Sequence, residues 1–173
     1  MTKMERRPET LKKAYHLAAH PEGGWFAEAY TAPFTAGDRP LAGSIYFLLG
    51  GGEISHFHQI DCDEIWYWHE GCGLRITLLQ NGEKRELLLG GDVQAGQRAM
   101  AVIPAGAVFA AENIDGGGYT FMSCATVPAF RYEGFRLVGR EEIADTFPGD
   151  GALLRLAFDE TARKSAESQL PRD

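Results

Sequence analysis

Two histidines and one glutamate near the middle of the chain have the residue types and spacing of a metal site. His56 and His58 are two residues apart, and Glu64 follows after five intervening residues. Side chains two apart on an extended strand project from the same face, so both imidazoles could reach one ion. Two imidazoles and a carboxylate suit a first-row divalent metal and leave positions open for substrate. The pattern therefore predicts Fe, Mn, Ni or Zn bound by His56, His58 and Glu64.

The same residues have two other interpretations. Without a metal, a histidine in a cavity lined by aromatic side chains can act as a general base near neutral pH. Alternatively, the three side chains form only a buried polar network that stabilises the interior. The residue types alone leave all three interpretations open.

Short strands separated by glycine-rich turns must position these residues. An apolar run at 44–49 ends in three glycines, and an aromatic and β-branched run after Asp63 is typical of a returning strand. Asn81-Gly82 is a strong hairpin signal between strands at 74–79 and 85–89. Further strands are expected at 25–31, 101–103, 108–113 and 119–127, and helices at 8–19 and 140–147. This order predicts an all-β fold, an antiparallel barrel or jelly roll with short terminal helices.

Strand alternation suggests which side chains line the interior of this fold. Trp66 and Trp68 share a face with Glu64, either as core residues or as platforms for ligand stacking. Glu28 lies between Phe26 and Tyr30 on one strand face, which makes it a candidate for reaching a binding pocket.

Length and composition restrict the classes of protein. The 173 residues fit one domain, with a β core at about 20–139 and a C-terminal helix and tail at 140–173, of which the polar part from 159 is expected to fray or protrude. A formal charge of −7 argues against nucleic acid and anionic membranes as partners. No apolar run is long enough to span a bilayer, and the charged residues 1–7 do not resemble a secretory signal. Three cysteines without close spacing favour a reducing, cytoplasmic location.

The turn and ligand residues together resemble the cupin superfamily. Its first motif is matched by Gly50, His56, His58, Glu64 and Gly71, and its second by Gly96, Pro104, Gly106 and Asn113. The resemblance covers about residues 15–157 and is similar to a small single-domain subgroup, the Cupin_5 type, whose further marks are His20-Pro21-Glu22-Gly23-Gly24, Ser55-His56-Phe57-His58, Asp63-Glu64-Ile65-Trp66 and Val102-Ile103-Pro104-Ala105-Gly106. Phe109 stands where the fourth metal ligand of the family, a histidine, is expected.

The resemblance implies a cupin-like jelly-roll barrel that binds a small polar metabolite. It suggests a metal-dependent enzyme or an epimerase-like enzyme on a sugar-type substrate, or an oxygenase. In an epimerase-like reaction His58 would be the base, with Glu28, Tyr46 or Tyr119 as the acid. Trp66, Trp68, Phe109 and Tyr119 would form the substrate pocket. The alternative is a non-catalytic binding or sensing module that uses the same pocket, and a homodimer is expected in either case.

Overall fold

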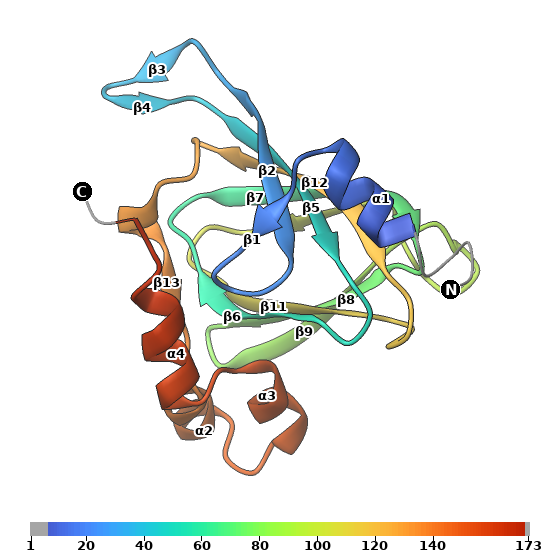
Figure 1. Ribbon diagram of the computed structural model, residues 1–173. Helices are drawn as coiled ribbons and strands as arrows, with labels where there is room; N and C mark the ends of the chain where they lie inside the picture. The colour runs from blue at the N-terminus through green and yellow to red at the C-terminus, as the bar shows by residue number, and fades with distance from the viewer. Residues whose placement is uncertain (1–6, 172–173) are drawn as a thin grey trace.

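Two antiparallel sheets face each other and enclose the main core (Figure 1). The computed structural model describes residues 7–171. One sheet has six strands, in the order β1 (Ala18–Ala19), β2 (Trp25–Thr31), β5 (Gly43–Leu49), β12 (Thr120–Val127), β7 (Asp63–Gly71) and β10 (Met100–Ile103). The other has five, in the order β13 (Arg136–Leu137), β6 (Ile54–Gln59), β11 (Val108–Asn113), β8 (Leu74–Gln80) and β9 (Glu83–Leu89). The predicted all-β jelly roll is confirmed, although no strand within residues 7–171 joins the two sheets into a continuous barrel.

Local turn chemistry accounts for several of these elements. Asn81 and Gly82 both have positive φ, as a two-residue hairpin turn requires, and they join β8 to β9 as predicted. The connection between β2 and β5 contains a small hairpin of β3 (Thr35–Ala36) and β4 (Arg39–Pro40) that projects from the body (Figure 1).

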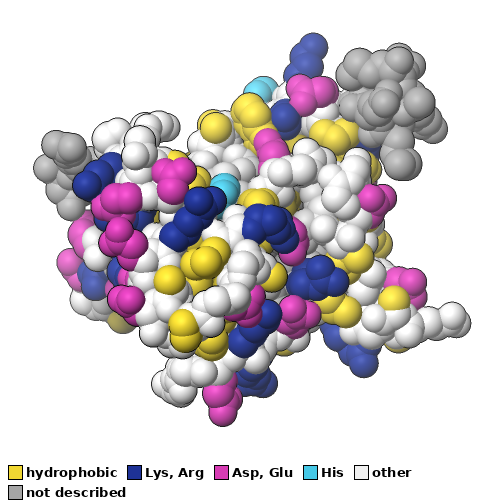
Figure 2. Space-filling view, turned by 90° about the horizontal axis from the view of Figure 1, so that it is seen from below, with side chains coloured by type: hydrophobic (Ala, Val, Ile, Leu, Met, Phe, Trp, Pro, Cys, Tyr) yellow, Lys and Arg dark blue, Asp and Glu magenta, His cyan; other side chains and the backbone are white. Residues whose placement is uncertain are grey.

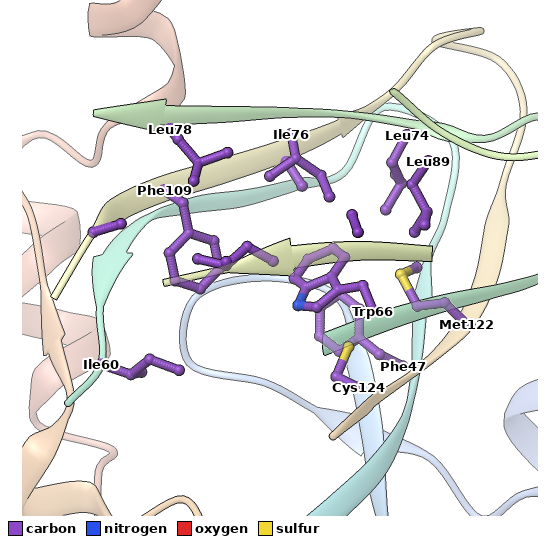
Figure 3. Packing of buried hydrophobic residues seen from close by; sticks show 14 of the residues in the cluster. Phe47, Ile60, Trp66, Leu74, Ile76, Leu78, Leu89, Phe109, Met122 and Cys124 are labelled. Carbon is purple, nitrogen blue, oxygen red and sulfur yellow. The ribbon is translucent and has the colours of Figure 1, made fainter. Parts of the chain in front are cut away.

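The core between the sheets consists of large apolar side chains from both. Figure 3 shows Trp66 beside Phe47 and Cys124, with Ile76 and Leu74 approaching from the other sheet. A second cluster lies under the C-terminal helices, and a third lies under α1 (Arg7–Ala14). Alternating residues of a strand pack into different clusters, so each sheet buries parts of both of its faces.

The C-terminal segment is more ordered than its polar composition predicts. After the 3-10 helix η1 (Tyr132–Gly134) come α2 (Arg140–Thr146), α3 (Gly151–Leu156) and α4 (Glu160–Glu167). The prediction that the segment from residue 159 frays is wrong for α4, because Asp159 caps its N-terminus and Arg163 pairs with Glu160 and Glu167. The last two residues of the expected tail lie outside the described range.

The surface seen from below carries interspersed charges. Figure 2 shows basic and acidic side chains side by side on this face. Elsewhere in the described chain too, exposed charges form pairs, such as Lys84 with Asp150 and Arg155 with Glu112. Such exposed pairs contribute little to stability, but they leave no broad field of one sign on this face.

Candidate functional site

A β-bulge in β6 separates the two histidines that the sequence predicts on one face. In the pairing with β11, His58 lies opposite Phe109 and Ser55 lies opposite Ala111, so residues 56 and 57 share one partner position. An extra residue of this kind interrupts the alternation of side chains. His58 and Ser55 are buried near Glu22, whereas the His56 ring stacks on Phe158 with 3.9 Å between ring centroids. The expectation that His56 and His58 project together is therefore wrong.

A tight turn between β1 and β2 places Glu22 beside His58, where His56 was expected. Gly23 has a φ of +111°, and a Cβ at this position would lie 2.0 Å from the carbonyl oxygen of Ile54. Glycine is therefore required for the turn to approach β6 so closely. The backbone N–H of His56 donates to the carbonyl of Glu22 over 2.9 Å, which fixes the turn against the strand.

Glu22 is the centre of a buried hydrogen-bond network. One carboxyl oxygen lies 3.0 Å from Nε2 of His58, and the other accepts a hydrogen bond of 2.7 Å from the Ser55 hydroxyl. Nδ1 of His58 donates to the carbonyl of His56 over 2.7 Å, because a carbonyl oxygen can only accept. Both ring nitrogens of His58 therefore face acceptors, an arrangement that suits an imidazolium beside a carboxylate.

The two partners shift each other's pKa values in opposite directions. Burial alone would raise the pKa of Glu22, but the charges of His58 and His20 and the hydrogen bonds from His58 and Ser55 lower it to about 2. Burial alone would lower the pKa of His58, but the charge of Glu22 and the bonds to Glu22 and His56 raise it overall. Burial lowers the pKa of the neighbouring His20, which favours a neutral ring there.

Glu64 faces the same cavity from β7, in the sheet opposite the β6 strand that carries His58, and its surroundings differ from those of Glu22. Its side chain is buried, and burial together with the charge of Glu22 raises its pKa to about 7, despite the opposing charge of His58. Trp66 and Cys124 lie beside the carboxyl group. The indole nitrogen of Trp66 is buried and has no hydrogen-bond acceptor within residues 7–171. Its N–H is near Glu64 but does not reach bonding geometry.

The cavity between these groups has a volume of about 180 Å³. It is small for a ligand pocket, since such pockets usually measure roughly 300–1,000 Å³. Exposed residues of β2, including Glu28 and Tyr30, are part of its lining and form the side nearest solvent. The lining is otherwise rich in aromatic side chains, namely Phe26, Phe47, Trp66, Phe130, Tyr132 and Phe135.

The structure brings some of the predicted site residues together and not others. The cavity lining includes His58, Glu28, Glu64 and Trp66, and it does not include His56, Tyr46, Trp68, Phe109 or Tyr119. The catalytic roles suggested for His58 and Glu28 stay predictions.

Four of the excluded residues belong to other environments. Tyr46 stacks on Phe121 in the cluster under α1, and the hydroxyl of Tyr119 donates to Glu70. Trp68 packs against Gly91. Phe109 lies behind the histidine, with 4.1 Å between its ring centroid and that of His58, so it supports the ring and does not line the pocket.

The predicted three-ligand metal centre does not form in this arrangement. Within residues 7–171, no three His, Cys, Asp or Glu side chains are placed to hold a metal ion. The bulge turns His56 away, and both nitrogens of His58 already bond to protein groups. The residues present therefore do not fit the group that the motif implies.

Sequence reasoning missed the residues that surround His58. Glu22, His20 and Ser55 were noticed only as part of motifs or turns, and Tyr132 was not singled out. The available signal was the Gly23-Gly24 pair, because paired glycines permit a close backbone approach that can insert the preceding side chain.

The fold and the cavity define a small jelly-roll domain with a buried acid–base cluster between its sheets. Residues 9–138 match the Cupin_5 family of the cupin superfamily (DUF985). The chain belongs to this family, as its motifs suggest.

The chain is similar to proteins of comparable length from several organisms. The crystal structure of protein SO0799 from Shewanella oneidensis is 32% identical, with a TM-score of 0.83, and the match covers 88% of this chain and 98% of that one. A hypothetical protein from Leishmania major is 26% identical, with a TM-score of 0.79 and coverage of 87% and 98%. The uncharacterised protein YML079W of Saccharomyces cerevisiae is 25% identical over 90% of this chain and 88% of its own.

Among the described residues, none of the helices has the length and apolar character needed to cross a bilayer.

Proposed function

We propose that the chain binds a small polar metabolite between its sheets and moves a proton on it, as an isomerase or epimerase of hydroxy-carbonyl compounds. The observation that carries this proposal is the pair of buried carboxyl groups that face one cavity, Glu22 from the turn between β1 and β2 and Glu64 from β7. Glu22 is paired with His58 and Ser55, whereas no cation within residues 7–171 forms an ion pair with Glu64, on which the charge of His58 acts only from a distance. Two acids whose surroundings drive their pKa values apart are a recurring sign of acid–base assignments.

Glu64 is the proton-transfer group in this proposal. A general base or acid works best when its pKa lies near the working pH, and burial brings the pKa of Glu64 to about 7. Its carboxylate takes the proton from the carbon next to the ligand carbonyl, and the C–H electron pair moves to the carbonyl oxygen as an enolate forms. For the isomer, Glu64 returns the proton to the former carbonyl carbon, while the hydroxyl proton on the neighbouring oxygen moves to the former carbonyl oxygen. For the epimer, water protonates the first carbon on its opposite face, and Glu64 releases its proton to solvent.

Glu22 and His58 supply fixed charges on the other side of the cavity. Glu22 holds His58 in one orientation and, through its own negative charge, raises the proton affinity of Glu64. The unpartnered indole N–H of Trp66 is a buried donor in the lining and suits an oxygen on which charge develops. Together these groups form a preorganised environment around a ligand of modest size.

Hydrogen exchange into deuterated water tests the proposal directly. The protein is incubated with a panel of small aldoses, ketoses and hydroxyketones, and loss of the proton next to the carbonyl is followed by NMR. We expect exchange that Glu64→Gln reduces by at least about 100-fold, the lower range for a general acid–base group. The matched control is Glu83→Gln, an exposed carboxylate on β9, which should leave the rate unchanged. Equal rates in wild type and Glu64→Gln, or no exchange across the panel, would contradict the proposal.

A non-catalytic binding or sensing module is the second candidate. One observation favours it: both nitrogens of His58 are bonded to protein acceptors, so this histidine has no free lone pair for a ligand. A ligand that binds without any proton exchange would support this candidate. Homodimer formation remains a prediction for either function.

A further inference from the structure

The cavity contains carboxyl groups and imidazoles but no strongly basic side chain. Its lining includes three glutamates, Glu22, Glu28 and Glu64, and two histidines, His20 and His58. No lysine or arginine within residues 7–171 is part of this lining. The imidazolium of His58 is bonded to Glu22 and its charge also acts on Glu64, so three carboxyl groups share this one cation and the neutral ring of His20.

Arginines close to the cavity in sequence are used elsewhere. Arg39 directs two nitrogens to the carboxylate of Asp61, at 2.8 and 3.0 Å, and a third to the carbonyl of Ala129 at 2.6 Å. Arg131 lies 3.5 Å from the same Asp61. These guanidinium groups are held outside the lining by a carboxylate of their own, so they are not positioned to bind an anionic ligand inside.

Aromatic rings form much of the remaining wall. Phe130, Tyr132 and Phe135 meet edge to face, with ring centroids 5.0–6.3 Å apart. The negative faces of such rings attract a positive charge, and carboxylates added to aromatic walls are the usual surroundings of bound ammonium groups. The charges of Glu28 and Glu22 both act on the hydroxyl of Tyr132, so these carboxyls and rings share one region of the cavity.

We propose that the ligand is a small organic cation, a protonated amine that also carries a hydroxyl or carbonyl oxygen. The ammonium group would neutralise the excess carboxylate charge and lie against the aromatic rings. The oxygen would accept the hydrogen bond that the buried indole N–H of Trp66 lacks. The inference rests on the proposed function in one respect only, namely that the ligand occupies this same cavity.

The same features exclude anionic ligands. An anion placed among these carboxyl groups would lose its hydration without gaining a free cationic partner, because the imidazolium of His58 is already paired with Glu22. Phosphorylated sugars, sugar nucleotides and simple carboxylates are therefore disfavoured. The volume of about 180 Å³ further restricts the ligand to a compact molecule.

Three probes of nearly equal shape test this inference. We would measure binding of 1-amino-2-propanol, 1,2-propanediol and lactate to the full chain by ligand-observed NMR; the three are a cation, a neutral molecule and an anion built on one carbon skeleton. The amine should bind at least about tenfold more tightly than the diol, a difference that one desolvated charge contact readily supplies. Lactate should give no specific signal. Tighter binding of the diol or of lactate, or no detectable binding of the amine, would overturn the inference.

Glu28 offers a variant that preserves the fold. Its side chain is exposed at the cavity edge, so Glu28→Gln should fold normally and weaken amine binding by about threefold to tenfold. Glu83→Gln removes the same charge from β9 and should leave binding unchanged. Equal effects of both variants would indicate a general response to net charge and would contradict a specific site.

The outcomes also separate this inference from the proposed function. Binding of the amine without exchange of any proton would support the cation site and contradict the proposed isomerase activity. Proton exchange on neutral sugars, together with no tighter binding of the amine than of the diol, would support the proposed isomerase activity and contradict the cation site.

Discussion

The two walls of the cavity differ in how completely their polar groups are paired. On the wall built by the turn at 20–24 and β6, Glu22, Ser55 and His58 satisfy one another. On the opposite wall of β7 and β12, the described part of the chain provides no cation that bonds to Glu64 and no acceptor for the Trp66 indole. Both walls are equally buried, so exposure does not explain the difference.

This difference indicates separate roles for the walls. A fully satisfied network rigidifies a structure, since each member loses a partner if another is removed. An unsatisfied buried group is costly and is usually kept because something else binds to it. We therefore interpret the Glu22 wall as the fixed electrostatic frame and the Glu64 wall as the surface that meets the ligand.

The largest expected effect is the loss of Glu22. Glu22→Ala leaves the His58 imidazolium buried without its counter-ion and the Ser55 hydroxyl without its acceptor. Removing one member of a buried ion pair costs about 3–5 kcal/mol, so the free energy of unfolding should fall by that amount in urea titrations. Glu28→Ala, at the exposed edge of the same cavity, is the control and should change stability by less than about 0.5 kcal/mol.

The pH dependence of wild type provides an independent check of the same wall. The pKa of Glu22 is depressed from 4.5 to about 2 in the fold, so its stabilising contribution is complete above about pH 4.5 and is lost as the pH falls toward 2. Glu22→Ala should lack this part of the acid transition. If wild type and Glu22→Ala lose stability in parallel between pH 4.5 and 2, Glu22 does not act as the fixed electrostatic frame of the cavity.

Replacing Glu64 by glutamine should increase the free energy of unfolding at high pH, whereas replacing Glu22 should decrease it. The pKa of Glu64 is raised from 4.5 to about 7, so the folded state holds its proton more tightly than the unfolded state. Stability from this proton is complete below about pH 4.5 and is lost as the pH rises to about 7. Glutamine resembles the protonated acid, so Glu64→Gln should be near neutral at pH 4.5 and stabilise the protein by about 1–3 kcal/mol at pH 8.

Thermal melts of the two proteins across pH 4.5–8 would measure this effect. Wild type should lose melting temperature toward high pH, and Glu64→Gln should retain more of it. A Glu64→Gln protein that is less stable than wild type at pH 8 would mean that the carboxylate has a stabilising partner, and the contrast between the walls would fail.

Much of the scaffold, but only half of the site, could be predicted from the sequence. Strand periodicity and the Asn81-Gly82 turn depend on neighbouring residues, so the strands and the hairpin were found at nearly their observed bounds. His58 and Glu64 face one cavity as predicted. The helix α4 was missed although its signals are local, namely the cap at Asp159 and the charge pairs of Arg163.

The missing half of the site depends on tertiary contacts that local patterns do not encode. The bulge in β6 exists because β6 carries one more residue than β11 between two paired positions, and alternation alone gives no sign of it. Glu22 enters the cavity because Gly23 lets its turn approach Ile54, a contact between segments about thirty residues apart. Both features depend on contacts between segments that are distant in sequence. The residue types of the site could therefore be predicted from one sequence, but their contact partners could not.

The smallest expected effect tests the bulge itself. His56→Ala removes a ring that stacks on Phe158 and bonds through Nδ1 to the carbonyl of Glu22 over 2.9 Å. Loss of one stack and one hydrogen bond should lower the free energy of unfolding by about 1–2 kcal/mol. Because the ring points away from the cavity, amine binding should not change. His69→Ala, which removes a bond to Ser123 on the outer face, is the matched control. If His56→Ala abolished ligand binding while keeping its stability, the ring would have to reach the ligand, and the alternation predicted from His-x-His would describe the site better than the bulge does.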